Sequence, residues 1–198
     1  MLRPRKRRAA EDADDAEDGS VTSHGARVYF YAAVSRENVL KLQTCLRDAT
    51  AAALAPATPE AEPRLYQHIF SNGGDAFAGL AGVDHIVRNR VPVVTVADGM
   101  VASAASFLLI AGARRLALPH AFVRIHQLSI YGFEGKYADL VDEMQNSHAL
   151  MRAIRALYQD RTSLTAERLD ELLTKELDLD AATCADAGIV DAVLGPPA

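Results

Sequence analysis

The chain has 198 residues, enough for one sizeable hydrophobic core and little more than one domain. Its formal net charge of -5 gives no support for a chain-wide nucleic-acid-binding surface. No apolar run reaches the roughly 18 residues that a membrane-spanning helix needs. The two cysteines, Cys45 and Cys184, are too few for a disulfide framework, and we expect them to pack as free thiols in a reducing, cytoplasmic compartment.

The first 25 residues differ in composition from the rest of the chain. A basic run at residues 3–8 is followed by an acidic run at residues 11–18, with almost no large apolar side chains. Opposed charge blocks of this kind are typical of disordered segments, because they offer no apolar surface to bury. We therefore expect a disordered charged tail over residues 1–25 and one folded domain over residues 26–195.

The folded part is predicted to begin with a strand at residues 27–31, which is rich in β-branched and aromatic side chains. Ser35 then caps a helix whose apolar residues recur on one side. Three prolines among alanines and acidic residues predict a surface loop over residues 51–63.

Strands and helices alternate along the middle of the chain. Each predicted strand is short, apolar and bounded by turn residues, and the first two are followed by helical patterns. This alternation predicts an α/β fold with a largely parallel sheet and right-handed crossovers. The predicted strands are 65–70, 91–97, 115–118 and 122–126.

One long helical pattern follows, from about residue 136 to residue 158, with apolar side chains recurring at intervals of three and four. Met144 lies on its apolar stripe, and methionines in such a stripe suit self-association. The loop before it carries Ile130, Tyr131 and Phe133, which an isolated protomer would leave in water. We therefore expect this helix and this loop to lie at a subunit interface.

Ser103 stands where the strand over 91–97 gives way to the next helix. Unpaired backbone N–H groups at such a junction can stabilise an oxyanion. His126 ends a later predicted strand, and a hydroxyl with a histidine beside it is the pair that nucleophilic acyl transfer needs. Gly73 and Gly74 end the preceding strand, where they leave the backbone free to aim N–H groups at the same carbonyl.

With these residues the chain resembles the proteolytic subunit of the Clp protease family, caseinolytic serine peptidases with a crotonase-like fold. The resemblance implies a ββα superhelix with a largely parallel sheet and a long handle helix. It runs from about residue 27 to residue 194, in the family's order and with nearly its spacing. The matching segments are 71–74, 78–81, 99–106, 111–113, 115–121, 125–127 and 187–191.

The resemblance implies that Ser103 is the nucleophile and His126 the general base, with the backbone N–H groups of Gly74 and Ala104 as the oxyanion hole. Two positions depart from the family. Asn72 replaces the usual proline before the paired glycines, and Ala104 replaces the usual methionine after the nucleophile. Because Ala104 would contribute only its N–H, that change affects the shape of the pocket more than its chemistry.

The third member of the catalytic triad is left with two candidates. Counting back without gaps from Gly188 puts the family's aspartate at Glu176, a residue one methylene longer that still accepts a hydrogen bond from imidazole. Asp178, two residues on, would share the same face of a strand and is the alternative acid. No metal and no organic cofactor is implied, and no histidine pair has the spacing of a zinc site.

The resemblance further implies a homo-oligomer of stacked heptameric rings, a tetradecamer, that degrades unfolded proteins and peptides in an inner chamber. A separate AAA+ unfoldase ATPase would feed it, because this chain has no phosphate-binding G-x-x-x-x-G-K-[ST] loop. No nucleic-acid or membrane partner is expected. Three other functions stay open: an inert ring subunit, a viral capsid-maturation peptidase of the same fold, and a crotonase-type acyl-CoA enzyme. Ser103 and His126 together favour a peptidase over the first and the third.

Overall fold

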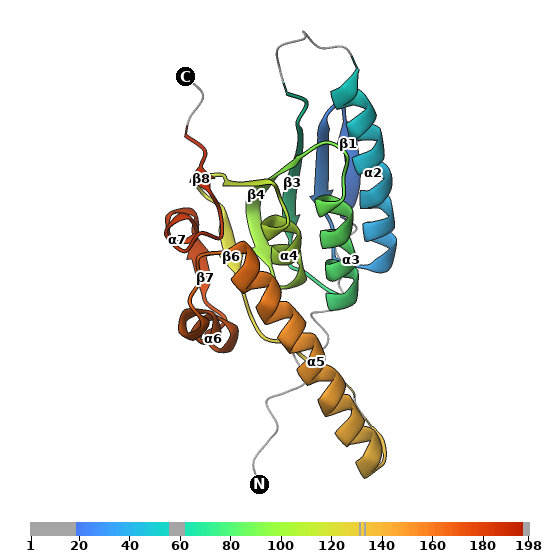
Figure 1. The fold of residues 1–198 in the computed structure, drawn as a ribbon, viewed down its shortest axis with the longest axis vertical. Helices are drawn as coiled ribbons and strands as arrows, with labels where there is room; N and C mark the ends of the chain where they lie inside the picture. Colours follow the sequence, from blue (N-terminus) through green and yellow to red (C-terminus); the bar gives the residue numbers. More distant parts are fainter. Residues whose placement is uncertain (1–18, 56–61, 131, 133, 196–198) are drawn as a thin grey trace.

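The computed structural model describes residues 19–55, 62–130, 132 and 134–195 (Figure 1). It is an α/β fold, as the sequence predicts. The strands are β1 (Ser20–His24), β2 (Arg27–Tyr31), β3 (Leu65–Ser71), β4 (Val93–Ala102), β5 (Arg114–Ala117), β6 (Phe122–Arg124), β7 (Asp178–Asp180) and β8 (Ala192–Val193). The helices are α2 (Arg36–Leu54), α3 (Ala76–Val87), α4 (Ala104–Ile110), α5 (Tyr137–Arg161), α6 (Ala166–Lys175) and α7 (Ala181–Asp186).

The sheet is largely parallel, in the order β1-β2-β3-β4-β5-β8, with β6 paired to β4 and β7 paired to β6. The β1–β2 and β6–β7 ladders are antiparallel. Strand β4 is ten residues long, so its first half pairs with β5 and its second half with β6. In the second ladder Ala102 lies opposite Arg124. The sheet therefore brings the segment after β6 beside the end of β4.

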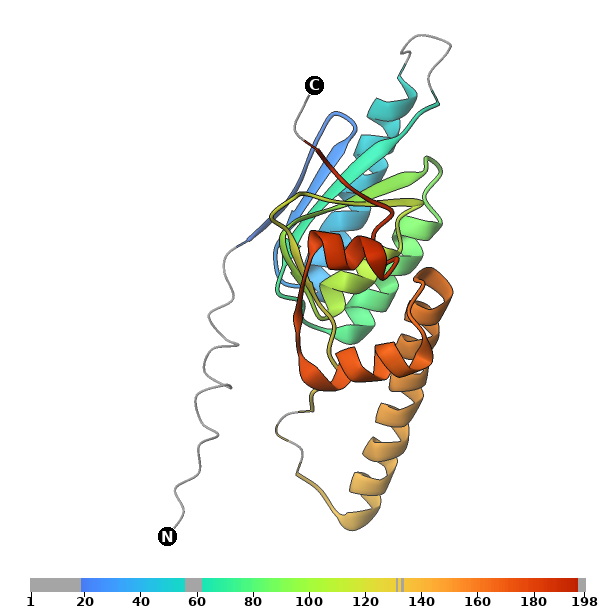
Figure 2. The same ribbon diagram turned by 90° about the vertical axis from the view of Figure 1, so that its left-hand side faces the viewer.

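Helices α2, α3 and α4 lie together on one face of the sheet (Figures 1 and 2). In β3 the buried residues Leu65, Gln67 and Ile69 alternate with more exposed ones, the pattern of a strand with one covered face. All seven residues of α4 are buried. The helix that follows Ser103 is thus enclosed in the main hydrophobic core, which gives the residues at its start a rigid support.

The other face of β2 and β3 carries aromatic and polar side chains. The rings of Tyr29 and His68 stack with 5.1 Å between their centroids. The Tyr31 hydroxyl donates a hydrogen bond to Asp98, and Nδ1 of His68 lies 3.5 Å from the same carboxylate. Burial lowers the pKa of His68, and the charge of Asp98 opposes that shift. Tyr31, His68 and Asp98 therefore form a partly buried polar cluster on this face.

The C-terminal segment is attached to the sheet by an ion pair between Arg115 and Asp191. The backbone N–H of Arg115 donates to Oδ2 of Asp191 at 2.7 Å. The guanidinium also donates to the carbonyl of Gly188 at 2.8 Å and to that of Arg161, the last residue of α5. One arginine therefore joins β5, the end of α5 and the turn at 188–191, three parts that are far apart in sequence.

Two expected boundaries are wrong. Residues 20–24, assigned to the tail, form β1, which pairs antiparallel with β2. Residues 51–54, assigned to a loop, continue α2, because alanines favour helix until Ala55, which precedes a proline, takes an extended conformation. Residues 1–18 of the expected tail and residues 56–61 of the expected loop lie outside the described residues.

The long helix is confirmed as α5, and its N-terminal half projects beyond the rest of the fold (Figures 1 and 2). Tyr137 is 83% exposed, and Leu140 and Met144 are more than half exposed. Ile130 in the preceding loop is also exposed, whereas Tyr131 and Phe133 lie outside the described residues. Among the described helices, none is both long and apolar enough to span a membrane.

Gln67 provides a test of the core. Its side chain is fully buried, and neither polar atom of its amide has a hydrogen-bond partner in the described part of the chain. We expect Gln67→Met to raise the free energy of unfolding by about 1–3 kcal/mol, the cost of a buried unsatisfied polar group. Denaturant titration followed by circular dichroism measures this change.

The control is Thr95, which lies opposite Gln67 on β4 and is equally buried. Its hydroxyl does have a partner, the carbonyl of Leu109 at 2.6 Å. Thr95→Val should therefore lower the free energy of unfolding by about 1 kcal/mol. A Gln67→Met protein that is no more stable than the wild type would contradict the prediction.

Candidate active site

Ser103 lies between the end of β4 and the start of α4, so the predicted strand–helix junction is confirmed. Its backbone has φ 54° and ψ −131°, which is uncommon for a residue other than glycine and costs about 1–3 kcal/mol. A sharp strand-to-helix turn of this kind presents a serine hydroxyl at the tip of the turn. The conformation is therefore the one expected of a nucleophile.

Three hydrogen bonds hold this turn. The N–H of Ser103 donates to the carbonyl of Arg124 on β6 at 2.9 Å. The carbonyl of Ser103 accepts from the N–H of Ser106 at 2.9 Å and from the hydroxyl of Ser106 at 2.5 Å. The peptide groups on both sides of Ser103 are thus held, one by the neighbouring strand and one by the first turn of α4.

The paired glycines lie directly against this serine. Gly73 has φ 98°, and a Cβ there would be 2.5 Å from the Cβ of Ser103, so no larger residue fits. Gly74 has φ 146° and bridges Val34, which donates to the carbonyl of Gly73 and accepts from the N–H of Asp75, both at 2.8 Å. In this parallel pairing the N–H of Gly74 points away from Val34.

A second N–H group is available at Ala104. As the first residue of α4, Ala104 has no acceptor within the helix for its N–H. The nitrogen of Ala104 lies only 3.0 Å from the position that a Cβ of Gly73 would take. The N–H groups of Gly74 and Ala104 therefore flank the same turn, as an oxyanion hole requires.

His126 follows β6 and is half-buried. Its Nδ1 lies 2.8 Å from the carbonyl oxygen of Gln127. Because a carbonyl oxygen only accepts hydrogen bonds, the neutral ring must carry its proton on Nδ1. Its Nε2 then has a free lone pair, the form of histidine that acts as a general base.

These groups meet at one cavity of about 240 Å³, which Gly74, Ser103, Ala104 and His126 all line. Its other walls are mainly apolar. They include Phe77, Phe107, Leu128, Leu150 and Ile154. A hydroxyl, an imidazole and two backbone donors in an apolar hollow can together perform acyl transfer.

Neither candidate acid lines this cavity. Asp178 forms a two-pronged ion pair with Arg124, with Nε–Oδ1 and Nη2–Oδ2 distances of 2.6 and 2.8 Å. The hydrogen bonds from Arg124 lower the pKa of this carboxyl. Glu176 is exposed in a left-handed conformation (φ 50°, ψ 48°) at the end of α6. The structure thus brings Ser103, His126 and the two backbone donors to one cavity and places neither candidate carboxylate there.

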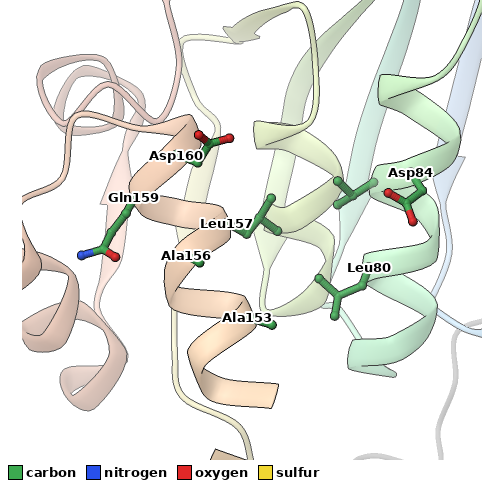
Figure 3. Close-up of a pocket in the computed structure, with 8 residues that line it drawn as sticks. Leu80, Asp84, Ala153, Ala156, Leu157, Gln159 and Asp160 are labelled. Carbon is green, nitrogen blue, oxygen red and sulfur yellow. The ribbon is translucent and has the colours of Figure 1, made fainter. Parts of the chain in front are cut away.

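A larger groove of about 770 Å³ lies between α3 and α5 (Figure 3). It contains two carboxylates, Asp84 and Asp160, but no serine, histidine or cysteine. Its remaining lining residues are Leu80, Val83, Ala153, Ala156, Leu157 and Gln159. It offers no hydroxyl or thiol nucleophile with a histidine base, so the smaller cavity is the candidate active site. Within the described ranges, no cluster of three or more His, Cys, Asp or Glu side chains could hold a metal ion.

Comparison with known proteins agrees with this geometry. A family model described as Clp protease matches residues 24–197. The chain belongs to the Clp protease family. It is also similar to an ATP-dependent Clp protease proteolytic subunit of Chlorella vulgaris, with 33% identity over 131 residues. That match covers 65% of this chain and 65% of the relative's length, so the chain spans about two thirds of the Clp protease subunit that it resembles.

Three groups at this candidate site do not follow from the sequence pattern. The carbonyl of Gln127 sets the tautomer of His126. Every residue has a backbone carbonyl, so the amino-acid type at position 127 does not predict this contact. Arg124 binds Asp178, a pairing that depends on the register of β6 with β7. The hydroxyl of Ser106 donates to the carbonyl of Ser103, and only its place one helical turn after Ser103 in the sequence could have indicated this contact.

The two candidate acids can be separated by mutation. We expect Glu176→Gln to lower kcat at least about tenfold, because a carboxylate that stabilises the imidazolium is poorly replaced by an amide. We expect Asp178→Asn to lower kcat less than about threefold, because Asp178 already binds Arg124. Steady-state hydrolysis of a fluorogenic peptide measures both values. The reverse order would make Asp178 the third member of the triad.

Proposed function

We propose that this chain is a serine endopeptidase that hydrolyses peptide bonds in unfolded proteins. The observation that carries the proposal is the strained turn at Ser103 (φ 54°), which shares one cavity with His126 and with two backbone donors. Membership of the Clp protease family supports the same activity. The other cavity described above, between α3 and α5, offers no serine or cysteine together with a histidine.

The reaction follows from the roles of these groups. Oγ of Ser103 attacks the carbonyl carbon of the scissile bond, and Nε2 of His126 accepts the hydroxyl proton. The negative charge on the carbonyl oxygen is stabilised by the N–H groups of Gly74 and Ala104. When the C–N bond breaks, His126 gives its proton to the leaving amine. Water, activated by the same imidazole, then releases the acyl group and restores the serine.

The walls of the cavity suit a peptide substrate. Phe107, Leu150 and Ile154 line it, so an apolar side chain next to the scissile bond would be taken out of water. The carbonyl of such a bond must reach Gly74, which lies three residues after the end of β3. An extended peptide that adds as a strand beside this segment meets the requirement, whereas a folded chain does not.

Active-site labelling tests the proposed function. A fluorophosphonate probe should label the wild type, and Ser103→Ala should abolish both labelling and peptide hydrolysis. His126→Ala should slow both by several orders of magnitude, because members of a triad act as a unit. Ser129→Ala is the matched control, since it removes another hydroxyl from the lining of the same cavity and should label like the wild type. Absence of labelling in the wild type would favour an inert ring subunit.

We further infer a homo-oligomer of stacked, heptameric rings that encloses the active sites and receives unfolded chains from a separate AAA+ ATPase. The exposed apolar side chains on the projecting half of α5 support an interface between protomers. Both Cys45 and Cys184 are buried and free, which fits a cytoplasmic location. The name of the Chlorella vulgaris relative, an ATP-dependent proteolytic subunit, supports an ATPase partner.

The interface can be tested at Met144. Met144→Glu places a charge in the exposed apolar stripe of α5, and we expect the assembly to dissociate, because burial of an unpaired charge costs several kcal/mol. Peptide hydrolysis should fall with it. Gln145→Glu makes a similar charge change at the adjacent exposed position and is the control. Sedimentation velocity measures the oligomer. A Met144→Glu protein that stays assembled would contradict this use of α5.

A further inference from the structure

A chain of buried hydroxyl groups connects α5 to the carbonyl of Ser103. Oγ of Ser106 lies 2.5 Å from that carbonyl oxygen and 2.5 Å from the hydroxyl oxygen of Tyr158. A carbonyl only accepts, so the single proton of the Ser106 hydroxyl is donated to Ser103. The Tyr158 hydroxyl must therefore be the donor to Ser106. The direction of the chain is fixed, from Tyr158 through Ser106 to Ser103.

Both hydroxyl groups lie outside the reach of substrate. Ser106 is fully buried, and Tyr158 is 1% exposed. Burial raises the pKa of Tyr158, so its hydroxyl keeps its proton and remains a donor throughout the working range of pH. The Tyr158 ring also packs edge-on against Phe107, with 5.8 Å between the ring centroids. Loss of either hydroxyl leaves this ring contact in place, so its effect on catalysis passes through the carbonyl of Ser103.

The carbonyl that they hold belongs to the peptide group between Ser103 and Ala104. A peptide group is planar, and its C=O and N–H point in opposite directions. Holding the oxygen of Ser103 at one end of the plane consequently fixes the direction of the Ala104 N–H at the other end. Hydrogen bonds in a chain also polarise one another, which strengthens that N–H as a donor.

We propose that Tyr158 and Ser106 are positioning residues, which hold the Ser103–Ala104 peptide so that the Ala104 N–H points at the developing oxyanion. The proposal rests on the proposed peptidase function. The backbone N–H of Ser106 donates to the same carbonyl at 2.9 Å, so removal of the hydroxyl weakens this support without abolishing it. Helix α5 thereby stabilises the transition state from behind the nucleophile.

The hydrogen-bonded chain from Tyr158 through Ser106 to the carbonyl of Ser103 is called the relay below. Two variants test it in the full-length protein. Ser106→Ala and Tyr158→Phe should each lower kcat about tenfold, the effect of roughly one hydrogen bond, with KM within about twofold of the wild type. The double variant should be little worse than Ser106→Ala alone, because both changes break the same chain. Equal, additive losses would show that the two hydroxyls act separately and would overturn the proposal.

The matched control is Thr95→Val. Thr95 is as buried as Ser106, and its hydroxyl donates to Leu109 at the other end of the same helix, α4. A loss of stability alone would therefore lower kcat in Thr95→Val as much as in Ser106→Ala. We expect Thr95→Val to keep kcat within about twofold of the wild type. Equal kcat losses in the two proteins would overturn the relay.

The pH profile and the labelling rate complete the test. In Tyr158→Phe the plateau of kcat should fall, and the midpoint of its pH dependence should stay at the wild-type value. A shifted midpoint would make Tyr158 part of the proton transfer and overturn a positioning role. Fluorophosphonate labelling separates the two hypotheses. If the wild type does not label, the peptidase assignment fails. If the wild type labels and both variants label as fast as the wild type, the peptidase assignment stands and only the relay fails.

Discussion

The backbone conformation of Ser103 is the constraint on which the rest of the site depends. A non-glycine residue at φ 54° is held at a cost of about 1–3 kcal/mol, so its surroundings must favour that geometry over relaxed alternatives. Strand β6 binds the N–H of Ser103 and α4 binds its carbonyl. Gly73 gives the turn the space that it needs. Ser103 is therefore positioned by two strands and a buried helix, which restrict its motion more than a surface loop would.

Much of the fold follows from hydrophobic periodicity, because β3, β4 and α3 bury one face or both and so show it in their residue order. Hydrophobic periodicity does not predict an element that is stabilised by something other than burial of apolar side chains. Strand β1 is polar and no more than half-buried, so its sequence shows no alternation of apolar residues. Its hydrogen-bonded ladder with β2 stabilises it instead. The last turn of α2 reads as a loop because prolines lie just beyond it, although its alanines favour helix.

The candidate site was predictable to the same degree. Ser103 and the paired glycines lie in short motifs next to predicted strand ends, and His126 ends a predicted strand, so local sequence was enough to single them out. The role of Ala104 followed only from the family resemblance. The acid was not, because counting along the chain gives a position and no partner. Only the register of β6 with β7 shows that Asp178 faces Arg124. Tyr158 is 52 residues from Ser106, and its contact depends on how α5 crosses the core. Helix α5 therefore contacts Ser106 through its C-terminal half and exposes apolar side chains at its other half.

The two cysteines lie in different parts of the fold, Cys45 on α2 and Cys184 on α7. Burial raises the pKa of both thiols, that of Cys184 to about 12, so neither is a reactive thiolate in the native protein. An alkylating reagent can reach them only when the surrounding helix opens. The rate of alkylation at each cysteine therefore measures how often its surroundings unfold locally. Cys45 reports on the helical layer over β1–β3, and Cys184 reports on the C-terminal segment.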